Sequence, residues 1–135
     1  MTRDETLALL QRYLAAVEEG ATGETLAQFY EPNVEMREHP NRFSPNGATR
    51  DLAAILASAQ AGQAILASQR FVLRDAIIEG DRAAITVGWT GALKVDAPAY
   101  GLKAGAELRA EIAQIYRFAN GRIAAQQTFD CAWPF

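Results

Sequence analysis

Apolar residues recur at helical spacing over the first eighteen residues, which predicts a helix that packs one face on a core. Thr2 or Asp4 can cap its start and Gly20 can end it. The apolar stripe consists of Leu7, Leu10, Leu14 and Val17. Residues 23–30 predict a second, short helix that Pro32 stops, and the alanine-rich residues 50–68 predict a third.

The rest of the chain alternates between apolar and polar residues, which predicts strands. One short strand covers 34–39 and ends at His39-Pro40, and long strands cover 71–78, 83–95 and 107–119. Asn120-Gly121 then predicts a tight hairpin into a final strand, because both turn positions need positive φ. The regions 41–49 and 96–105 contain Pro and Gly and predict loops.

This order of elements predicts an α+β fold in a single domain over residues 1–135. A strongly curved antiparallel or mixed sheet would wrap over three N-terminal helices and leave a cone-shaped cavity. Helix one and the inner faces of the long strands would line that cavity.

Composition narrows the class of protein. Half of the 135 residues are apolar, and the net charge of -3 with no Lys/Arg cluster argues against nucleic-acid binding. One histidine and one cysteine make a dedicated metal site unexpected, and no cofactor motif is present. The sequence after Met1 does not form a signal peptide and no apolar run is long enough to span a membrane, so we expect a cytoplasmic protein without membrane contact.

Three titratable residues are candidates for proton transfer. Asp130 is flanked by aromatic and small residues, where it could act as an acid or base with a raised pKa, or only anchor the C-terminal tail. Histidine is the residue type whose usual titration falls near neutral pH, so His39 could move a proton at the cavity mouth, with Asp130 orienting its ring, or be structural. Glu38 could replace His39 as the base, or pair with Arg42 on the surface.

Several local motifs together resemble the nuclear transport factor 2-like superfamily, in its SnoaL-like branch. They are Arg12-Tyr13, Phe29-Tyr30, Pro32-Asn33-Val34-Glu35, His39-Pro40-Asn41, Tyr116-Arg117-Phe118 and Phe129-Asp130-Cys131. The resemblance covers essentially the whole chain and implies the curved α+β fold. It does not imply one function, because the superfamily holds ketosteroid isomerases, polyketide cyclases, epoxide hydrolases, dehydratases and proteins without a known reaction.

The resemblance also implies roles for individual residues. Tyr13 falls where ketosteroid isomerases have an oxyanion-hole tyrosine, and Gln114 falls where they have an acidic second donor. Their catalytic aspartate falls on Glu38 or His39, whereas Asp130 falls near the acid/base aspartate of SnoaL-like cyclases. Together these matches imply cofactor-free isomerisation, cyclisation or dehydration of a small hydrophobic carbonyl compound.

Apolar side chains are expected to form the wall of the pocket. They are Val17, Phe29, Ile85, Val87, Trp89, Ile112 and Tyr116. Small residues at Ala84, Thr86, Gly88 and Thr90 would let a second sheet approach the outer face, where the superfamily often dimerises, so a homodimer is expected. The alternatives to an enzyme are a non-catalytic small-molecule binding module and a protein-interaction domain.

Overall fold

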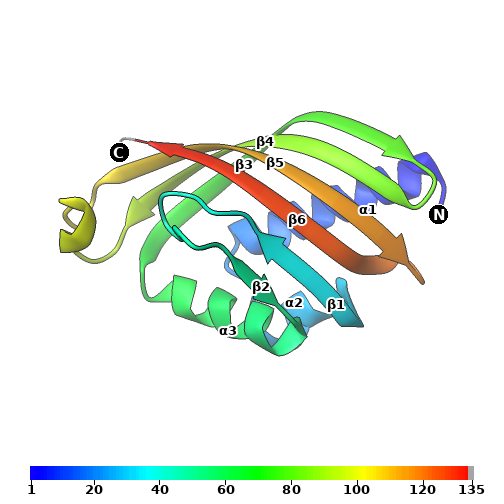
Figure 1. Cartoon of the computed structure of the whole chain (residues 1–135), viewed down its shortest axis with the longest axis horizontal. Helices are drawn as coiled ribbons and strands as arrows, with labels where there is room; N and C mark the ends of the chain where they lie inside the picture. The colour runs from blue at the N-terminus through cyan, green and yellow to red at the C-terminus, as the bar shows by residue number, and fades with distance from the viewer. Residues whose placement is uncertain (134–135) are drawn as a thin grey trace.

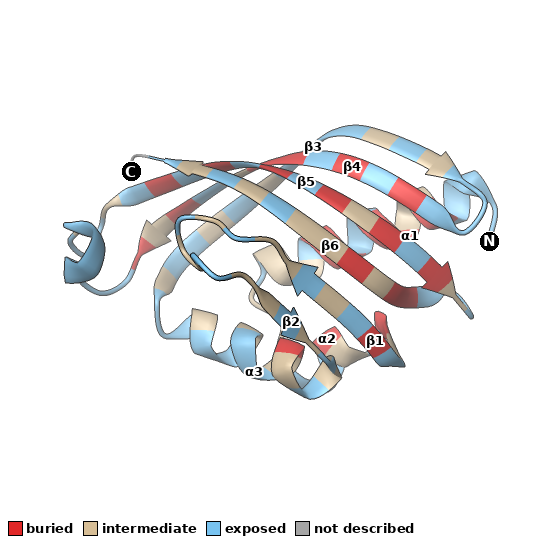
Figure 2. Ribbon diagram, viewed as in Figure 1, coloured by how far each residue is buried: buried red, intermediate tan, exposed pale blue. Residues whose placement is uncertain are grey.

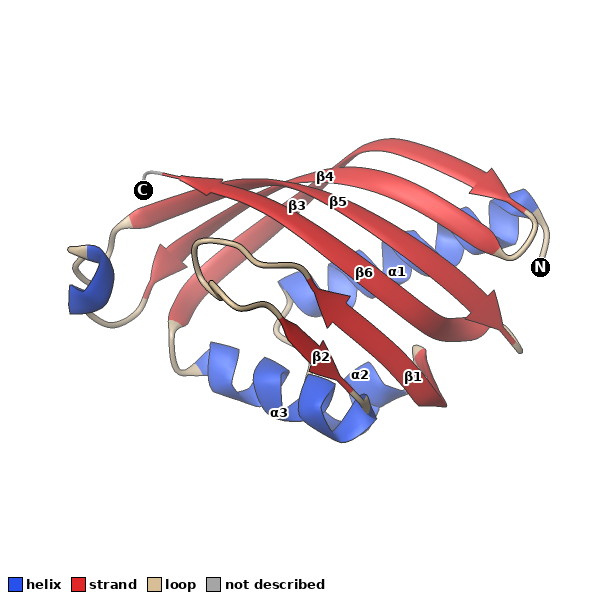
Figure 3. Cartoon of the chain, viewed as in Figure 1, coloured by secondary structure: helices blue, strands red, loops and turns tan. Residues whose placement is uncertain are grey.

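The computed structural model of the chain describes residues 1–133 as helices packed on a six-stranded sheet (Figure 1; Figure 3). The elements are α1 (Arg3–Glu18), α2 (Gly23–Ala27), β1 (Tyr30–Glu38), β2 (Ala48–Arg50), α3 (Leu52–Gln63), β3 (Leu66–Glu79), β4 (Arg82–Leu93), a 3-10 turn (Pro98–Tyr100), β5 (Glu107–Ala119) and β6 (Arg122–Trp133). The strand order is β2-β1-β6-β5-β4-β3. The sheet is mixed, because β1 runs parallel to β6 and the other pairs are antiparallel. The predicted α+β class is confirmed.

Local sequence explains how α1 begins and ends. Thr2 accepts a hydrogen bond from the backbone of Glu5 at 3.1 Å, and the two residues form a capping box. Gly20 follows the helix with a φ of 82°. The buried face carries Leu10, Tyr13 and Leu14. In the region that the structure describes, no helix is both long and apolar enough to cross a membrane.

The second and third helices are shorter than the sequence pattern predicts. Residue Tyr30, expected at the end of a helix, instead opens β1, where its ring is 2% exposed and its backbone pairs with Ile123 of β6. The alanine-rich segment leaves the helix at Gln63, because pairing of Leu66 with Leu93 extends β3 toward the N-terminus. Tertiary pairing outweighs helix propensity at both places. The strand β2 was not predicted, since three residues are too few to show an alternating pattern.

The long strands carry their buried residues at every second position (Figure 2). The turn between β5 and β6 has positive φ at Asn120 (53°) and Gly121 (73°), as the hairpin prediction requires. The inner faces of β4, β5 and β6 therefore point toward α1 and form one core with it. Toward the C-terminal end of β6 this inner face carries smaller and more polar groups, and a cavity remains there.

Candidate functional site

A cavity of about 250 Å³ lies against the inner faces of β3 to β6. Its lining is Phe43, Gln69, Phe71, Trp89, Ala110, Ile112, Gln114, Thr128 and Asp130. The strand register explains this set, because Gln114 pairs with Thr128 and Ile112 pairs with Asp130 across β5 and β6. Asp130 is the one ionisable side chain among these lining residues. An apolar pocket with a few convergent polar groups is the usual form of a small-molecule site.

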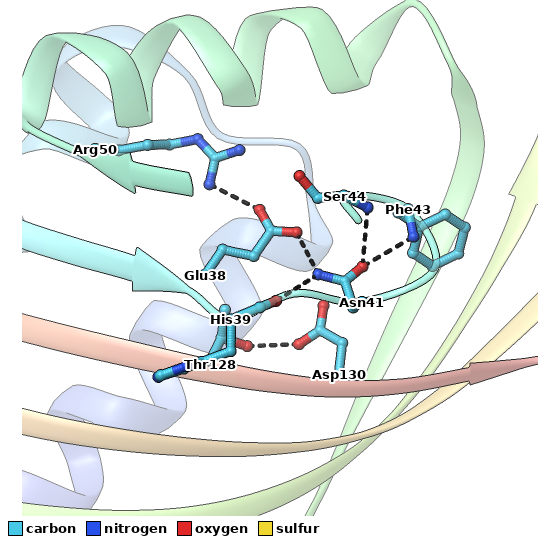
Figure 4. Close-up of polar contacts among 8 residues, drawn as sticks. All are labelled: Glu38, His39, Asn41, Phe43, Ser44, Arg50, Thr128 and Asp130. Atoms are coloured by element: carbon cyan, nitrogen blue, oxygen red, sulfur yellow. Dashed lines mark hydrogen bonds and ion pairs between the residues drawn. The ribbon is translucent and has the colours of Figure 1, made fainter. Parts of the chain in front are cut away.

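The Asp130 carboxyl group is half-buried, and the balance of its surroundings raises its pKa. Burial raises its pKa above the ordinary range, the hydroxyl of Thr128 lowers it, and the negative charge of Glu38 raises it. Thr128 donates to Oδ1 of Asp130 at 2.6 Å. Figure 4 shows both acidic side chains on the same side of β6. A carboxyl group with a raised pKa can release and take up a proton closer to neutral pH.

The Glu38 carboxylate is fixed by two partners. Arg50 of β2 donates to Oε1 at 2.8 Å, and the side-chain amide of Asn41 donates to Oε2 at 2.7 Å (Figure 4). The same Asn41 accepts hydrogen bonds from the backbone nitrogens of Phe43 and Ser44, which sets the turn of the loop after β1. The sequence offered a surface ion pair with Arg42 as the alternative role of Glu38, but the ion pair that fixes Glu38 is made with Arg50 and is largely buried. Glu38 acts on the site through its charge and through this loop.

Phe43 joins two loops at the cavity. Its ring packs edge-on against Trp89 and Tyr100, with centroids 6.4 Å and 6.1 Å apart. The hydroxyl of Tyr100 donates to the backbone oxygen of Phe43 at 3.3 Å. The loop after β1 and the 3-10 turn after β4 thus meet beside the cavity. Phe43 was not identified from the sequence, because apolar residues in a loop do not recur at a regular spacing.

A buried chain of hydrogen bonds runs from the core to the cavity wall. Tyr30 and Tyr13 join their hydroxyls at 2.6 Å, and Tyr13 donates to Oε1 of Gln126 at 3.3 Å. Nε2 of Gln126 donates to the hydroxyl of Tyr116 at 3.2 Å, and Tyr116 donates to Oε1 of Gln114 at 2.5 Å. Burial raises the pKa of Tyr13 and Tyr116. Tyr13, Tyr30 and Tyr116 are therefore neutral at ordinary pH.

The Tyr13 hydroxyl does not border the cavity. It was expected to donate directly to a substrate oxygen, but it lies in the core and donates to Gln126. Gln114 is the member of the chain that reaches the cavity. Tyr13 is therefore linked to the cavity only through its hydrogen-bonded neighbours, which end at Gln114.

The hypothesis that Asp130 orients the ring of His39 is wrong. The His39 ring stacks on Phe129 at 4.1 Å, and its Nε2 lies 2.9 Å from Oε1 of Gln127. Residues Gln127 and Phe129 alternate along β6 with Thr128 and Asp130, so they face the outer side of the sheet. The side chain of His39 is therefore outside the cavity, and Asp130 does not orient it.

Only some of the residues predicted to form the apolar wall line the cavity. Trp89 and Ile112 line the cavity. The core beneath it takes Phe29, Ile85, Val87 and Tyr116, each at most 8% exposed. Val17 lines a separate hollow of about 190 Å³ between α1 and α3. Thr128 and Ala110, missed by sequence reasoning, lie two residues from Asp130 and Ile112, so strand alternation could have found them.

Gln69 was missed because the third helix was expected to run to residue 68. In the structure it belongs to β3, accepts from the indole nitrogen of Trp89 at 3.0 Å and donates to the backbone of Val17 at 2.9 Å. It borders both the cavity and the hollow beside α1. Across residues 1–133, no three His, Cys, Asp or Glu side chains are grouped so that they could hold a metal ion.

The family model of the SnoaL-like domain matches residues 10–126, so the chain belongs to the SnoaL-like family. No curated protein sequence matches it. Among solved structures, it is similar to AclR, a candidate hydroxylase from Streptomyces galilaeus (TM-score 0.77, 14% identity, 96% of this chain and 91% of that chain covered). It is also similar to IdmH, a candidate polyketide cyclase from Streptomyces antibioticus (TM-score 0.76, 20% identity, 92% and 90% covered).

A third similar structure is a hypothetical protein of Catenulispora acidiphila with a ketosteroid isomerase-like fold, solved with trimethylamine (TM-score 0.67, 17% identity, 90% of this chain and 83% of that chain covered). At these identities the likeness concerns the fold. The expected SnoaL-like, nuclear transport factor 2-like fold, with polyketide cyclase and ketosteroid isomerase-like structural neighbours, is confirmed. Function rests on the cavity itself.

Proposed function

We propose that this SnoaL-like protein binds a small, largely apolar carbonyl compound in the cavity and moves a proton at the carbon beside the carbonyl. One observation carries the proposal: Asp130 and the amide of Gln114 share one wall of a cavity that is otherwise mainly apolar. They stand diagonally across β5 and β6, since Gln114 pairs with Thr128 and Ile112 with Asp130. Diagonal side chains on neighbouring strands can reach one bound group.

The proposed step needs no oxidant or reductant. The Asp130 carboxylate takes a proton from the α-carbon, and the C–H electron pair moves into an enolate. The negative charge develops on the carbonyl oxygen, where the Gln114 amide donates a hydrogen bond. Asp130 then returns the proton, to the same carbon or to another, and the carboxylate is restored. Isomerisation, cyclisation and dehydration can all begin with this step.

Hydrogen–deuterium exchange at the α-carbon of 1-indanone, followed by NMR in D₂O, tests the proposal. The protein is expected to accelerate the exchange over buffer. Ala110→Leu fills the cavity, because Ala110 is 3% exposed and lines it, and it should lower the accelerated rate by about 10²-fold by displacing the ketone. Ala113→Leu is the matched control, since Ala113 is exposed on the other face of β5. Exchange no faster than in buffer, or equal loss in both variants, would overturn the proposal.

A non-catalytic binding module is the second candidate. The observation that favours a binding module is that Asp130 is the single ionisable group among the described residues of the cavity lining, because His39 contacts Gln127 and supplies no second proton-transfer group. A binding module would gain thermal stability from 1-indanone, by about 2.7 kcal/mol at a hundredfold excess over the dissociation constant. It would leave the exchange rate at the buffer level. An interaction domain would show neither effect.

We also propose that the protein forms a homodimer through the outer face of the sheet. Four large apolar side chains are exposed there by strand alternation: Val72, Ile77, Phe129 and Trp133. The Arg74–Glu111 ion pair (2.7 Å) crosses the same face above Gly88, where an added Cβ would collide with the guanidinium group. The small residue at 88 thus accommodates this ion pair.

Sedimentation and thiol labelling test the dimer. Cys131 is exposed on the outer face, between Phe129 and Trp133 along β6, so association should slow its labelling as protein concentration rises. Phe129→Glu should give a monomer and fast labelling. Ile65→Glu is the control, because Ile65 is exposed in the link between α3 and β3. A monomeric wild type, or a dimer that survives Phe129→Glu, would rule out this interface.

A further inference from the structure

We infer that the buried chain Tyr30–Tyr13–Gln126–Tyr116–Gln114 is directional, and that it makes the inner end of the cavity a hydrogen-bond donor only. The pocket would then select ligands that place a carbonyl or other acceptor against Gln114 and reject ligands that place an N–H or O–H donor there. This inference rests on the proposed function for the nature of the ligand, but the direction of the chain stands on the free protein alone.

The direction of the hydrogen-bond chain is fixed at its Tyr30 end. Tyr30 is 2% exposed, and within residues 1–133 its one side-chain hydrogen-bond partner is the Tyr13 hydroxyl at 2.6 Å. A buried hydroxyl whose proton has no acceptor is costly, so Tyr30 donates to Tyr13. Tyr13 must then use its own proton on another acceptor, and that acceptor is Oε1 of Gln126.

Matching each remaining hydroxyl proton with an acceptor fixes the direction of the hydrogen bonds as far as the cavity. With Oε1 of Gln126 toward Tyr13, its Nε2 donates to Tyr116, and Tyr116 donates to Oε1 of Gln114. Turning either amide around, or both, leaves one hydroxyl proton in the chain without an acceptor. The observed arrangement is therefore the one in which every hydroxyl proton is used.

The carbonyl oxygen of Gln114 is thus directed toward Tyr116 in the core, and its NH₂ group, on the other side of the amide carbon, remains for the cavity. Among the described residues, Thr6 Oγ1 is the one fully buried polar side-chain atom without a partner, so the nitrogen of Gln114 is either partnered or accessible. Gln114 lines the cavity, which gives that nitrogen its access. Tyr116 and Gln126 are positioning residues: they decide which end of the Gln114 amide a ligand meets.

NMR on the free protein tests the direction without any ligand. The hydroxyl proton of Tyr116 should show a nuclear Overhauser effect to the side-chain amide protons of Gln126. An effect to the amide protons of Gln114 in its place would mean that the chain runs the other way and would overturn the inference. Tyr116→Phe provides the assignment of the hydroxyl signal.

Binding of two bicyclic probes tests the selection. 1-Indanone offers only an acceptor and indole offers only an N–H donor, and we expect the wild type to prefer 1-indanone by roughly tenfold. Tyr116→Phe frees the Gln114 amide to turn, so the ratio should fall to about one to threefold. Tyr30→Phe should keep the wild-type ratio, because the four remaining groups still use every proton in only one direction.

The outcomes separate this inference from the proposed function. A correct Overhauser pattern with no binding of either probe would refute the carbonyl ligand and, with it, the selection, while the direction of the chain would stand. Binding and exchange of 1-indanone with an unchanged ratio in Tyr116→Phe would refute the selection and leave the proposed function intact. An equal fall of the ratio in both tyrosine variants would point to general loss of structure and would also refute the selection.

Discussion

Asp130→Asn is expected to reduce the protein's acceleration of α-proton exchange by about 10²–10⁴-fold, the usual contribution of a positioned acid or base. Asparagine keeps the shape of the side chain and an oxygen that can accept from Thr128, which lies 2.6 Å from Oδ1 of Asp130. It cannot take up the proton. The exchange of 1-indanone in D₂O measures the loss, and a variant as active as the wild type would remove Asp130 from the mechanism.

The same substitution should stabilise the fold at neutral pH. Burial and Glu38 raise the pKa of Asp130 in the folded state, despite the opposing effect of Thr128. As pH rises, the unfolded chain therefore loses this proton first, and the fold loses stability until pH passes the folded pKa. Below the ordinary aspartate range the penalty vanishes. The Tm of Asp130→Asn should exceed that of the wild type at pH 7 and match it at low pH.

Two variants control this prediction. Glu38→Gln removes a charge that contributes to the raised pKa of Asp130, so that pKa should fall, as a carbon-detected titration of the Asp130 carboxyl would show. Glu35→Gln changes a carboxylate of the same strand that is exposed, and should leave the Asp130 titration unchanged. A stability difference that grows as pH falls would have the wrong sign and would contradict the raised pKa.

Much of the fold follows from the sequence because its strongest signals are local. The capping of α1 by Thr2 and the turn at Asn120-Gly121 need only neighbouring residues, and both occur as predicted. The errors in the predicted elements lie where pairing with a strand distant in the sequence determines the local structure. Tyr30 leaves its expected helix to pair with Ile123.

The site was harder to predict than the fold. Two residues on different strands meet only if both side chains point to the same face of the sheet, and the sequence does not show this for two strands at once. The pKa of Asp130 is raised, as the sequence suggested, but the cause differs from the one expected. Its sequence neighbours Phe129 and Trp133 lie exposed on the outer face, and residues of other elements bury its carboxyl group in the cavity. His39 was assigned to the same side of the sheet, but β1 ends so that its ring meets Phe129 on the outer face. The link from Tyr13 to Gln114 through Gln126 joins residues more than a hundred positions apart, and no local pattern marks it.

Gln126→Leu is expected to destabilise the protein by about 2–4 kcal/mol, because Gln126 bridges two buried hydroxyls. Its side chain is 3% exposed and contacts Tyr13 through Oε1 and Tyr116 through Nε2. Leucine fills a similar space but leaves one hydroxyl proton of the Tyr13–Tyr30 pair without an acceptor. For a domain of this size the Tm should fall by roughly 7–15 °C, which calorimetry or denaturant unfolding measures.

The neighbouring glutamine supplies the matched control. Gln127 lies on the opposite face of β6, is only half-buried and contacts His39, so Gln127→Leu should cost less than about 1 kcal/mol. Tyr13→Phe combined with Gln126→Leu should cost less than the sum of the two single changes, since each single change leaves one hydroxyl proton without an acceptor and the double change also leaves only one, that of Tyr30. Equal losses for the two glutamines, or strict additivity with Tyr13→Phe, would mean that the chain of hydrogen bonds does not hold the core together.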